Sequence, residues 1–216
     1  MKVLVVNGSP RKAGNTATLL RSALDGAASR GAQTELVHLY DLDFKGCVSC
    51  FACKTRKGKS YGRCAHADQL TPVLRAIEAT DALILGSPIY FGAVSGEMRC
   101  FLERLLFPYL VYSDPPQSLF EGGMRVGFVY TMNLPSAEVM REWGVADHLA
   151  AGERALARVF GHCEALHSFD TYQFRDYDKV VADRFDEVLK ARRRDEEFPK
   201  ECAQAFQMGA RLASAE

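Results

Sequence analysis

Three runs of the chain are almost continuously apolar, unlike the alternating pattern of a strand with one solvent-exposed face. They are Val3–Val6, Ala82–Leu85 and Val126–Tyr130. Short apolar runs of this kind are typical of parallel strands that helices cover on both faces. Two more mixed segments, Glu35–Leu39 and Ala165–Phe169, bring the predicted strands to five.

Between these strands, apolar residues recur at three- and four-residue spacing, which predicts amphipathic helices. The predicted helices cover Thr16–Arg30, Asp68–Ala79, Ser95–Phe107, Ser136–Phe160, Asp178–Arg193 and Pro199–Leu212. The alternation of strands and helices predicts a doubly wound α/β fold. With five strands, the pattern favours a flavodoxin-like parallel sheet in the order 2-1-3-4-5, with helices on both faces.

The chain of 216 residues contains no low-complexity linker and no internal repeat, so we expect a single domain over residues 1–216. Residues 46–66, rich in Gly, Lys and Cys, form a long predicted loop. Long loops in compact domains are usually functional or disordered. The residues from about 178 to 216 form a predicted C-terminal helical extension.

The charge balance argues against a general attraction to polyanions. Lys plus Arg and Asp plus Glu are equal at 27 each, so we expect neither a nucleic acid nor a membrane partner. No apolar stretch is long enough to cross a bilayer, and Met1-Lys2 leads into an apolar run too short for a signal peptide. These features predict a cytoplasmic protein, in which seven cysteines do not form a disulfide framework.

The first predicted strand runs into a loop suited to an anion, Asn7-Gly8-Ser9-Pro10-Arg11-Lys12-Ala13-Gly14-Asn15-Thr16. Its glycines permit close backbone approach, and the following helix offers unpaired N–H groups. The Ser, Asn and Thr side chains add donors, and Arg11 and Lys12 add charge. The five residues between Gly8 and Gly14 exclude a Walker A loop, and no Gly-x-Gly-x-x-Gly is present. The loop alone fits either a phosphate monoester site or a plain strand–turn–helix connection.

A second Gly-Ser-Pro sequence follows the third predicted strand and continues as Ile89-Tyr90-Phe91-Gly92. In a 2-1-3-4-5 sheet, strands one and three are neighbours at the switch point, where ligands bind beyond the carboxyl ends of the strands. One phosphate-like turn and one aromatic turn at this point suit a ligand with a phosphate end and a flat ring end, and FMN has that shape. Tyr90 and Phe91 are also suited to cover the core or a subunit interface.

Several motifs of the chain resemble those of the flavodoxin-like NAD(P)H-dependent FMN reductases, especially the branch that includes the iron–sulfur flavoproteins. They are GSPRKAGNT at 8–16, GCVSCFAC at 46–53, GRC with Asp68 at 62–68, LGSPIYFGAVSGEMRCFLERL at 85–105 and FDTYQFRDYDK at 169–179. The resemblance implies an FMN-binding oxidoreductase that uses NAD(P)H as co-substrate and passes electrons to a small-molecule acceptor. The alternative is an FMN electron-transfer protein, with or without an iron–sulfur cluster, that receives electrons from a protein partner.

By that resemblance, the first loop would hold the FMN phosphate, the segment after the third strand would border the isoalloxazine, and the end of the fourth strand would line the opposite side. The candidate cofactor-binding residues are Ser9, Arg11, Lys12, Gly14, Asn15, Thr16, Ser87, Pro88, Ile89, Tyr90, Phe91, Gly92, Thr131, Met132 and Asn133. No catalytic side chain is predicted, because the cofactor carries the difficult step of flavin hydride transfer.

The resemblance also implies a homodimer or homotetramer, with the helix after the third strand near the interface. Met98, Phe101 and Leu105 of that helix would then lie partly between subunits. The other interpretation of these three residues is an ordinary core stripe.

Cys47, Cys50 and Cys53, followed by Cys64, leave three interpretations open. The first is a set of free or loop-structuring thiols. The second is a [4Fe–4S] cluster that relays electrons from FMN, since ferredoxins use similar cysteine runs. The spacer from Cys53 to Cys64 is longer than in cluster-bearing relatives, but loop-closure costs grow slowly with length. The third is a zinc site or a redox disulfide, although Cys₄ zinc sites more often use two separated pairs.

Overall fold

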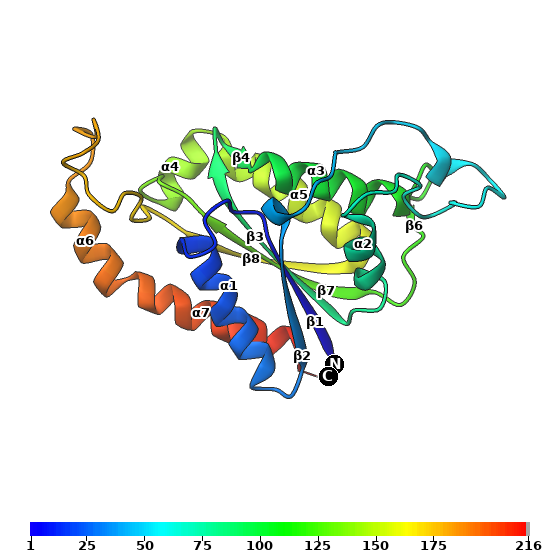
Figure 1. Cartoon of the computed structure of the whole chain (residues 1–216), viewed down its shortest axis with the longest axis horizontal. Helices are drawn as coiled ribbons and strands as arrows, with labels where there is room; N and C mark the ends of the chain where they lie inside the picture. Colours follow the sequence, from blue (N-terminus) through cyan, green and yellow to red (C-terminus); the bar gives the residue numbers. More distant parts are fainter. Residues whose placement is uncertain (215–216) are drawn as a thin grey trace.

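The computed structural model describes residues 1–214, and a parallel sheet runs through its centre (Figure 1). The sheet order is β2 (Gln33–His38), β1 (Lys2–Asn7), β3 (Ala82–Tyr90), β7 (Met124–Thr131) and β8 (Gly161–Ser168), all parallel. The predicted flavodoxin-like order 2-1-3-4-5 is therefore confirmed. Residues 215 and 216, at the end of the predicted 1–216 domain, lie outside the described residues.

Helices cover both faces of this sheet. On one face lie α1 (Asn15–Ala28) and α7 (Phe198–Leu212), and on the other lie α2 (Thr71–Ile77), α3 (Gly96–Leu106) and α5 (Val145–Phe160) (Figure 1). Met98, Phe101 and Leu105 of α3 are fully buried in the apolar cluster of the second face. These three residues are therefore a core stripe within the chain.

The predicted C-terminal extension contributes a structural layer, because α7 packs along α1. A Cβ atom at Gly26 would lie 1.9 Å from the carbonyl oxygen of Phe206, and one at Gly209 would lie 1.8 Å from that of Ala23. The two helices thus approach to backbone contact at positions where no larger residue fits. Met208 of α7 is buried in the apolar cluster between α1 and the sheet.

Three predicted helices are broken or clearly shortened in the structure, and one of them, Asp68–Ala79, is limited to α2 (Thr71–Ile77). The predicted helix Ser136–Phe160 is split into α4 (Ala137–Glu142) and α5, because Gly144 between them has a φ of 70°, in the left-handed region. The predicted helix Asp178–Arg193 begins only at α6 (Glu187–Glu196). Asp186 caps α6 by accepting a hydrogen bond from the Leu189 amide at 3.0 Å, and residues 178–186 precede this cap outside the helix.

β3 is longer than the predicted strand Ala82–Leu85 and continues to Tyr90. β1 ends at Asn7, opposite Gly86, so the residues of β3 after Gly86 have no β1 residue beside them. On the other side of β3, Pro88 still pairs in register with Thr131 of β7. A strand edge tolerates proline, which has no N–H to donate. The second Gly-Ser-Pro sequence is therefore strand and not turn. The chain reverses at Phe91-Gly92 into β4 (Ala93–Val94), which pairs antiparallel with β3.

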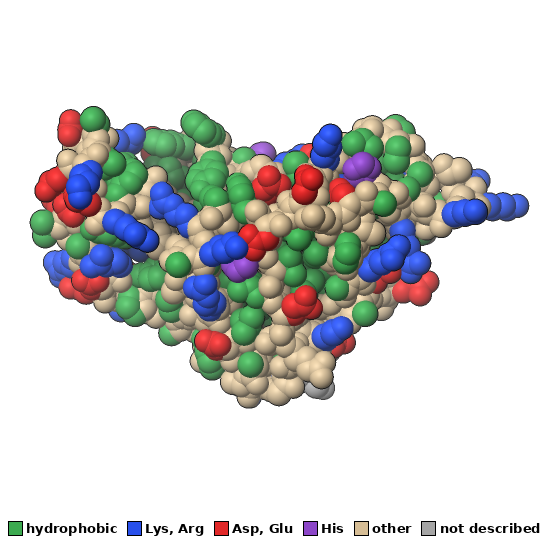
Figure 2. Space-filling view, in the orientation of Figure 1, with side chains coloured by type: hydrophobic (Ala, Val, Ile, Leu, Met, Phe, Trp, Pro, Cys, Tyr) green, Lys and Arg blue, Asp and Glu red, His purple; other side chains and the backbone are tan. Residues whose placement is uncertain are grey.

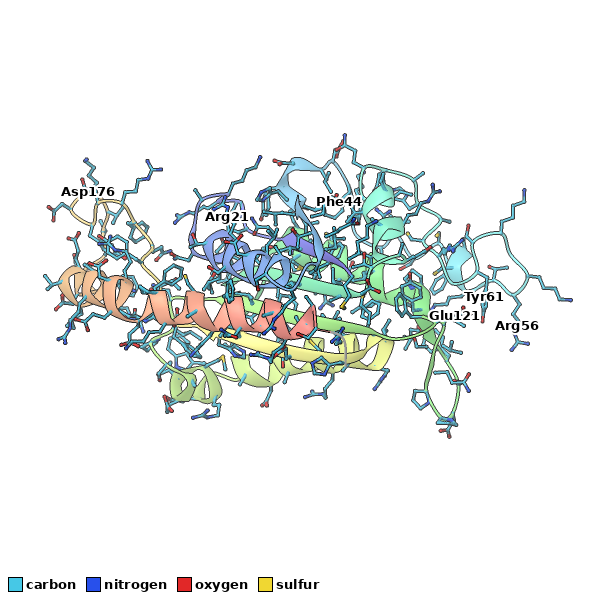
Figure 3. The ribbon with its side chains drawn as sticks, turned by 90° about the horizontal axis from the view of Figure 1, so that it is seen from below. Arg21, Phe44, Arg56, Tyr61, Glu121 and Asp176 are labelled. Atoms are coloured by element: carbon cyan, nitrogen blue, oxygen red, sulfur yellow. The ribbon has the colours of Figure 1, made fainter. Side chains whose placement is uncertain are left out.

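The remaining elements are short. They are the 3-10 turns η1 (Leu39–Asp41), η2 (Ala52–Lys54) and η3 (Phe107–Tyr109) and the hairpin of β5 (Leu110–Val111) and β6 (Gln117–Ser118). The predicted loop 46–66 contains η2 and extends from one end of the molecule, where Arg56 lies, whereas Asp176 lies at the opposite end (Figure 3). No helix within residues 1–214 has both the length and the hydropathy that crossing a membrane requires.

Candidate functional site

The loop between β1 and α1 is held in shape by its own polar groups. The Ser9 amide donates to Asn7 Oδ1 (2.9 Å), and the Arg11 amide donates to Ser9 Oγ (3.1 Å). The Gly14 amide closes the turn by donating to the Arg11 carbonyl (3.1 Å). Asn7 and Ser9 are buried, so this phosphate loop, residues 7–16, is formed in advance of any ligand.

The start of α1 leaves backbone donors without acceptors. Gly14 is the N-cap, no side chain caps the helix, and the first helical bond runs from the Thr18 amide to the Gly14 carbonyl (3.0 Å). Among the described residues, the amides of Asn15, Thr16 and Ala17 meet no hydrogen-bond acceptor. These amides lie at the positive end of the helix dipole and are suited to phosphate oxygens.

Ser95 ties the two Gly-Ser-Pro sequences together. Its hydroxyl donates to the Gly8 carbonyl (2.6 Å), and its amide donates to Ser87 Oγ (2.9 Å). Ser95 also caps α3, because its Oγ accepts a hydrogen bond from the Met98 amide (3.3 Å). The motifs do not place Ser95 among the candidate site residues, although a serine before a helix is a common N-cap signal.

The carboxyl end of β7 meets the phosphate loop from the other side. The buried hydroxyls of Thr16 and Thr131 share a hydrogen bond of 2.7 Å. Asn133 lies just beyond, and its side-chain amide donates to Gln173 Oε1 (3.3 Å). Met132, predicted to line the flavin site, is 2% exposed and packs in the core.

The segment after β8 lies across the phosphate loop, and we call residues 170–186 the C-terminal strap. Arg11 Nη1 donates to the Gln173 carbonyl (2.6 Å), and Asn15 Nδ2 donates to the Tyr172 carbonyl (3.0 Å). A pocket of about 950 Å³ lies between loop and strap. It is lined by Pro10, Arg11, Lys12, Ala13 and Gly14 of the loop, by Tyr172, Gln173, Phe174 and Arg175 of the strap, and by Arg194 of α6.

Aromatic residues stand at the rim beyond β3. Phe91 is fully exposed, with a φ of 50°, and Tyr90 is 44% exposed. Tyr40, which follows β2, lies beside them: burial, followed by the charges of Glu97 and Tyr90, raises the pKa of its hydroxyl. Ser87 and Ile89, by contrast, are buried and half-buried within β3. The rings of Tyr90 and Phe91 are therefore available to a ligand or to a second chain.

The four clustered cysteines border one small hollow of about 20 Å³ at the base of the loop 46–66. Cys53 is buried, and burial raises the pKa of its thiol. The buried Arg104 of α3 donates from Nε to Cys64 Sγ (3.3 Å). Within residues 1–214, no three His, Cys, Asp or Glu side chains are placed to hold a single metal ion, and the cysteines are unpaired.

A second pocket, of about 600 Å³, lies between α3 and α5, and we call it the α3–α5 groove. Leu102, Leu106, Leu149 and Val159 form apolar walls, and Phe128 and Tyr130 of β7 also line it. Arg99 pairs with Glu103 (3.3 Å) beside this groove.

The sheet order, with helices on both faces, defines a flavodoxin-like α/β protein. Residues 1–131 match the family model described as NADPH-dependent FMN reductase. The chain belongs to this family, which confirms the resemblance found in its motifs.

Curated relatives carry the name iron-sulfur flavoprotein. One from Methanocaldococcus jannaschii is 38% identical over 104 residues, which cover 48% of this chain and 51% of the relative. One from Clostridioides difficile is 28% identical over 147 residues, which cover 63% of each chain. The chain spans about half the length of the first curated relatives that it matches.

Solved structures share the fold along nearly the whole chain. An NAD(P)H:quinone oxidoreductase from Methanothermobacter marburgensis has a TM-score of 0.71 at 14% identity, covering 98% of both chains. An FMN-dependent NADH-azoreductase from Bacillus anthracis has a TM-score of 0.64 at 11% identity, covering 99% of this chain and 100% of the other. At such low identity these likenesses establish the flavodoxin-like fold and nothing finer.

Proposed function

We propose that the protein is an FMN-dependent oxidoreductase that oxidises NAD(P)H and reduces a small-molecule acceptor. The observation that carries this proposal is the preformed phosphate loop with free amides at Asn15, Thr16 and Ala17, in a chain of the FMN reductase family. Bound FMN would supply the hydride and electron chemistry. A cytoplasmic location and assembly as a homodimer or homotetramer stay predictions.

The side chains of the site would bind and orient the cofactor. The α1 amides and Arg11 would hold the phosphate, because backbone N–H groups and a guanidinium are strong phosphate donors. The hydrogen bond between Thr16 and Thr131 fixes the loop against the end of β7. Tyr90 and Phe91 would border the isoalloxazine ring and shield it from water. Lys12 pairs with Asp41 at 2.6 Å and would contribute charge at the edge.

The first experiment is the absorption spectrum of the purified protein, followed by titration of the flavin-free protein with FMN. We expect a yellow protein that retains FMN through gel filtration and oxidises NADPH or NADH steadily when quinones or nitro compounds are present. Failure to bind FMN would contradict the proposal. Tight FMN binding without turnover under any of these conditions would instead favour the electron-transfer protein that a protein partner reduces.

The four cysteines support a second proposal, a [4Fe–4S] cluster at the hollow bordered by Cys47, Cys50, Cys53 and Cys64. Four cysteine thiols are the donor set of such a cluster, but the hollow of about 20 Å³ would have to open to receive it. Arg104 Nε, 3.3 Å from Cys64 Sγ, would donate to a ligating sulfur. The cluster would supply one-electron transfer. Through this hydrogen bond, Arg104 of α3 would hold the Cys64 thiol in position.

Anaerobic purification tests the cluster through iron and sulfide content and absorbance beyond the flavin bands. We expect Cys50→Ser to lose iron, whereas Cys202→Ser, on α7 and away from the hollow, keeps it. A protein whose colour comes from flavin alone would contradict the cluster. Stoichiometric zinc, or a disulfide among the four thiols, would favour the third interpretation.

A further inference from the structure

The C-terminal strap is fastened to the phosphate loop at several points. Arg11 and Asn15 donate to strap carbonyls at 2.6 and 3.0 Å. From α6, the buried Lys190 reaches under the strap, with Nζ 2.5 Å from both Asn133 Oδ1 and Asp170 Oδ1. The strap is therefore a fixed wall of the pocket beside the loop.

The lining of this pocket is strongly cationic. Arg11, Lys12, Arg175 and Arg194 line it, and no Asp or Glu is among its lining residues within the described part of the chain. Figure 2 shows Lys and Arg side chains interspersed with Asp and Glu side chains on the end of the molecule that α6 and the strap form, so the excess of positive charge is confined to the pocket lining. Two of the pocket's four cations belong to the loop, and the other two come from segments more than 150 residues later in the sequence.

Arg194 and Arg175 differ in their contacts with the rest of the chain. The guanidinium of Arg194 lies 4.5 Å from the centre of the Tyr172 ring and donates to Asp195 Oδ1 (2.9 Å). Arg175 is exposed and forms no hydrogen bond or ion pair with any residue in 1–214. The adjacent Asp176 pairs with Lys179 at 2.7 Å, so its charge is already partly compensated. Arg175 is thus a cation at the pocket without an internal partner.

We propose that Arg175 and Arg194 recognise a phosphate monoester opposite the phosphate loop, so that strap and loop together form a two-sided site. This inference rests on the proposed function, which supplies two phosphate monoesters: the 5′-phosphate of FMN and the 2′-phosphate of NADPH. A dianion in this pocket, between residues 10–14 of the loop and the two later arginines, would accept charge-assisted hydrogen bonds from the guanidinium groups, which are about twice as strong as neutral ones. Arginine suits this task because its planar fork matches two phosphate oxygens.

The test uses the full-length protein with Arg175→Gln, Arg175→Lys and Arg194→Gln. Arg184→Gln is the matched control, because Arg184 is an exposed strap residue whose guanidinium lies over Trp143, outside the pocket. Affinities for FMN and riboflavin are measured by flavin fluorescence, and kcat/KM is measured with NADPH and NADH. Riboflavin and NADH lack the phosphate monoesters in question, so the two ratios isolate phosphate recognition from any general effect on the fold.

We expect Arg175→Gln to lower FMN affinity about tenfold and leave riboflavin affinity unchanged, with Arg194→Gln acting in the same direction. Arg175→Lys should recover part of the loss, and Arg184→Gln should match the wild type. Unchanged FMN affinity with a fallen NADPH-to-NADH ratio would assign the site to the dinucleotide. The inference is overturned if neither ratio moves by more than about twofold in the Arg175 and Arg194 variants. A wild-type protein that binds no flavin overturns the proposed function itself, and this inference with it.

Discussion

Single polar side chains hold the candidate site together, because they join elements that are far apart in the sequence. Thr16 and Thr131 are 115 residues apart, and Ser95 and Gly8 are 87 apart. No buried side-chain nitrogen or oxygen within residues 1–214 lacks a hydrogen-bond partner. Each of these pairs therefore has a measurable cost when one member is removed, since the other is left buried and unpaired.

Thr16→Val tests the first of these pairs. The substitution keeps the shape of the side chain but leaves the Thr131 hydroxyl, 4% exposed, without its partner. We expect the free energy of unfolding of the flavin-free protein to fall by about 1–3 kcal/mol, measured in urea. The double variant with Thr131→Val should lose less than the sum of the two single variants. Strict additivity would show that the two hydroxyls do not interact.

Arg104 and Asp68 provide a pH-dependent contribution to stability. Arg104 Nη1 lies 2.5 Å from Asp68 Oδ2, with only 1% of the arginine side chain exposed. Burial by itself raises the pKa of Asp68, but the hydrogen bond and charge of Arg104 outweigh it and hold that pKa below 3.8. A lowered carboxyl pKa stabilises the folded state above the unfolded pKa of about 4, and this contribution is lost as the pH falls through the folded pKa.

Asp68→Asn should therefore destabilise the protein most near neutral pH. We expect the difference in free energy of unfolding between wild type and variant to be constant from about pH 7 to about pH 5 and to shrink below about pH 4. Urea unfolding across this range measures it. The exposed pair of Arg141 and Glu138 supplies a control, because Glu138→Gln removes a surface ion pair that contributes little. A difference that stays constant down to about pH 3 would contradict the assignment.

At the level of whole elements, the packing of α7 on α1 depends on glycine. Gly209→Ala would bring a methyl group within 1.8 Å of the Ala23 carbonyl oxygen, so the helices must separate. We expect a loss of about 1–3 kcal/mol or more in the free energy of unfolding. Gly152→Ala in α5 meets nothing within 4 Å and should be neutral or stabilising by up to about 1 kcal/mol. Equal effects of the two substitutions would contradict this account of the helix contact.

The strands and the phosphate loop could be predicted because their signals are local. Apolar runs mark buried strands, and the sequence of residues 8–16 alone contains the glycines and donors that the loop uses. The strap could not be placed in the same way, since Arg11 and the Gln173 carbonyl are 162 residues apart and meet only in the folded chain. The break at Gly144 did have a local signal, a glycine after a helical segment, which the long apolar periodicity obscured.

The candidate site residues show the same difference between local signals and contacts that form only in the folded chain. Ser9 and Thr16 lie in the loop and first turn after β1, whereas Met132, directly after β7, continues the alternation of Phe128 and Tyr130 and packs with them in the core. The sequence does not single out Lys190 because α6 also contains three arginines, and nothing in the residue pattern shows which of these four cationic side chains is buried, at 2% exposure. Such residues become identifiable only when the structure shows what surrounds them.

On the scale of the molecule, the cysteine loop and the α3–α5 groove adjoin. Cys47, Glu103 and Phe107 border both the small hollow of the four cysteines and the groove. A protein seated in the groove would therefore also touch the loop 46–66. If a cluster occupies the hollow, this arrangement would bring it close to whatever covers the groove.

A second copy of the chain is the occupant that we predict for this groove, because the family resemblance implies a homodimer or homotetramer with the helix after the third strand near the interface, and α3 is that helix. The wild type should have two or four times the monomer mass of 23.9 kDa at micromolar concentration, measured by light scattering after gel filtration. Ala155→Arg places a charge in the groove lining and should shift the mass toward 23.9 kDa. Ala203→Arg, on the exposed side of α7, should leave the assembly unchanged. A wild type that stays monomeric would contradict the prediction, and an assembly that survives Ala155→Arg would place the interface elsewhere.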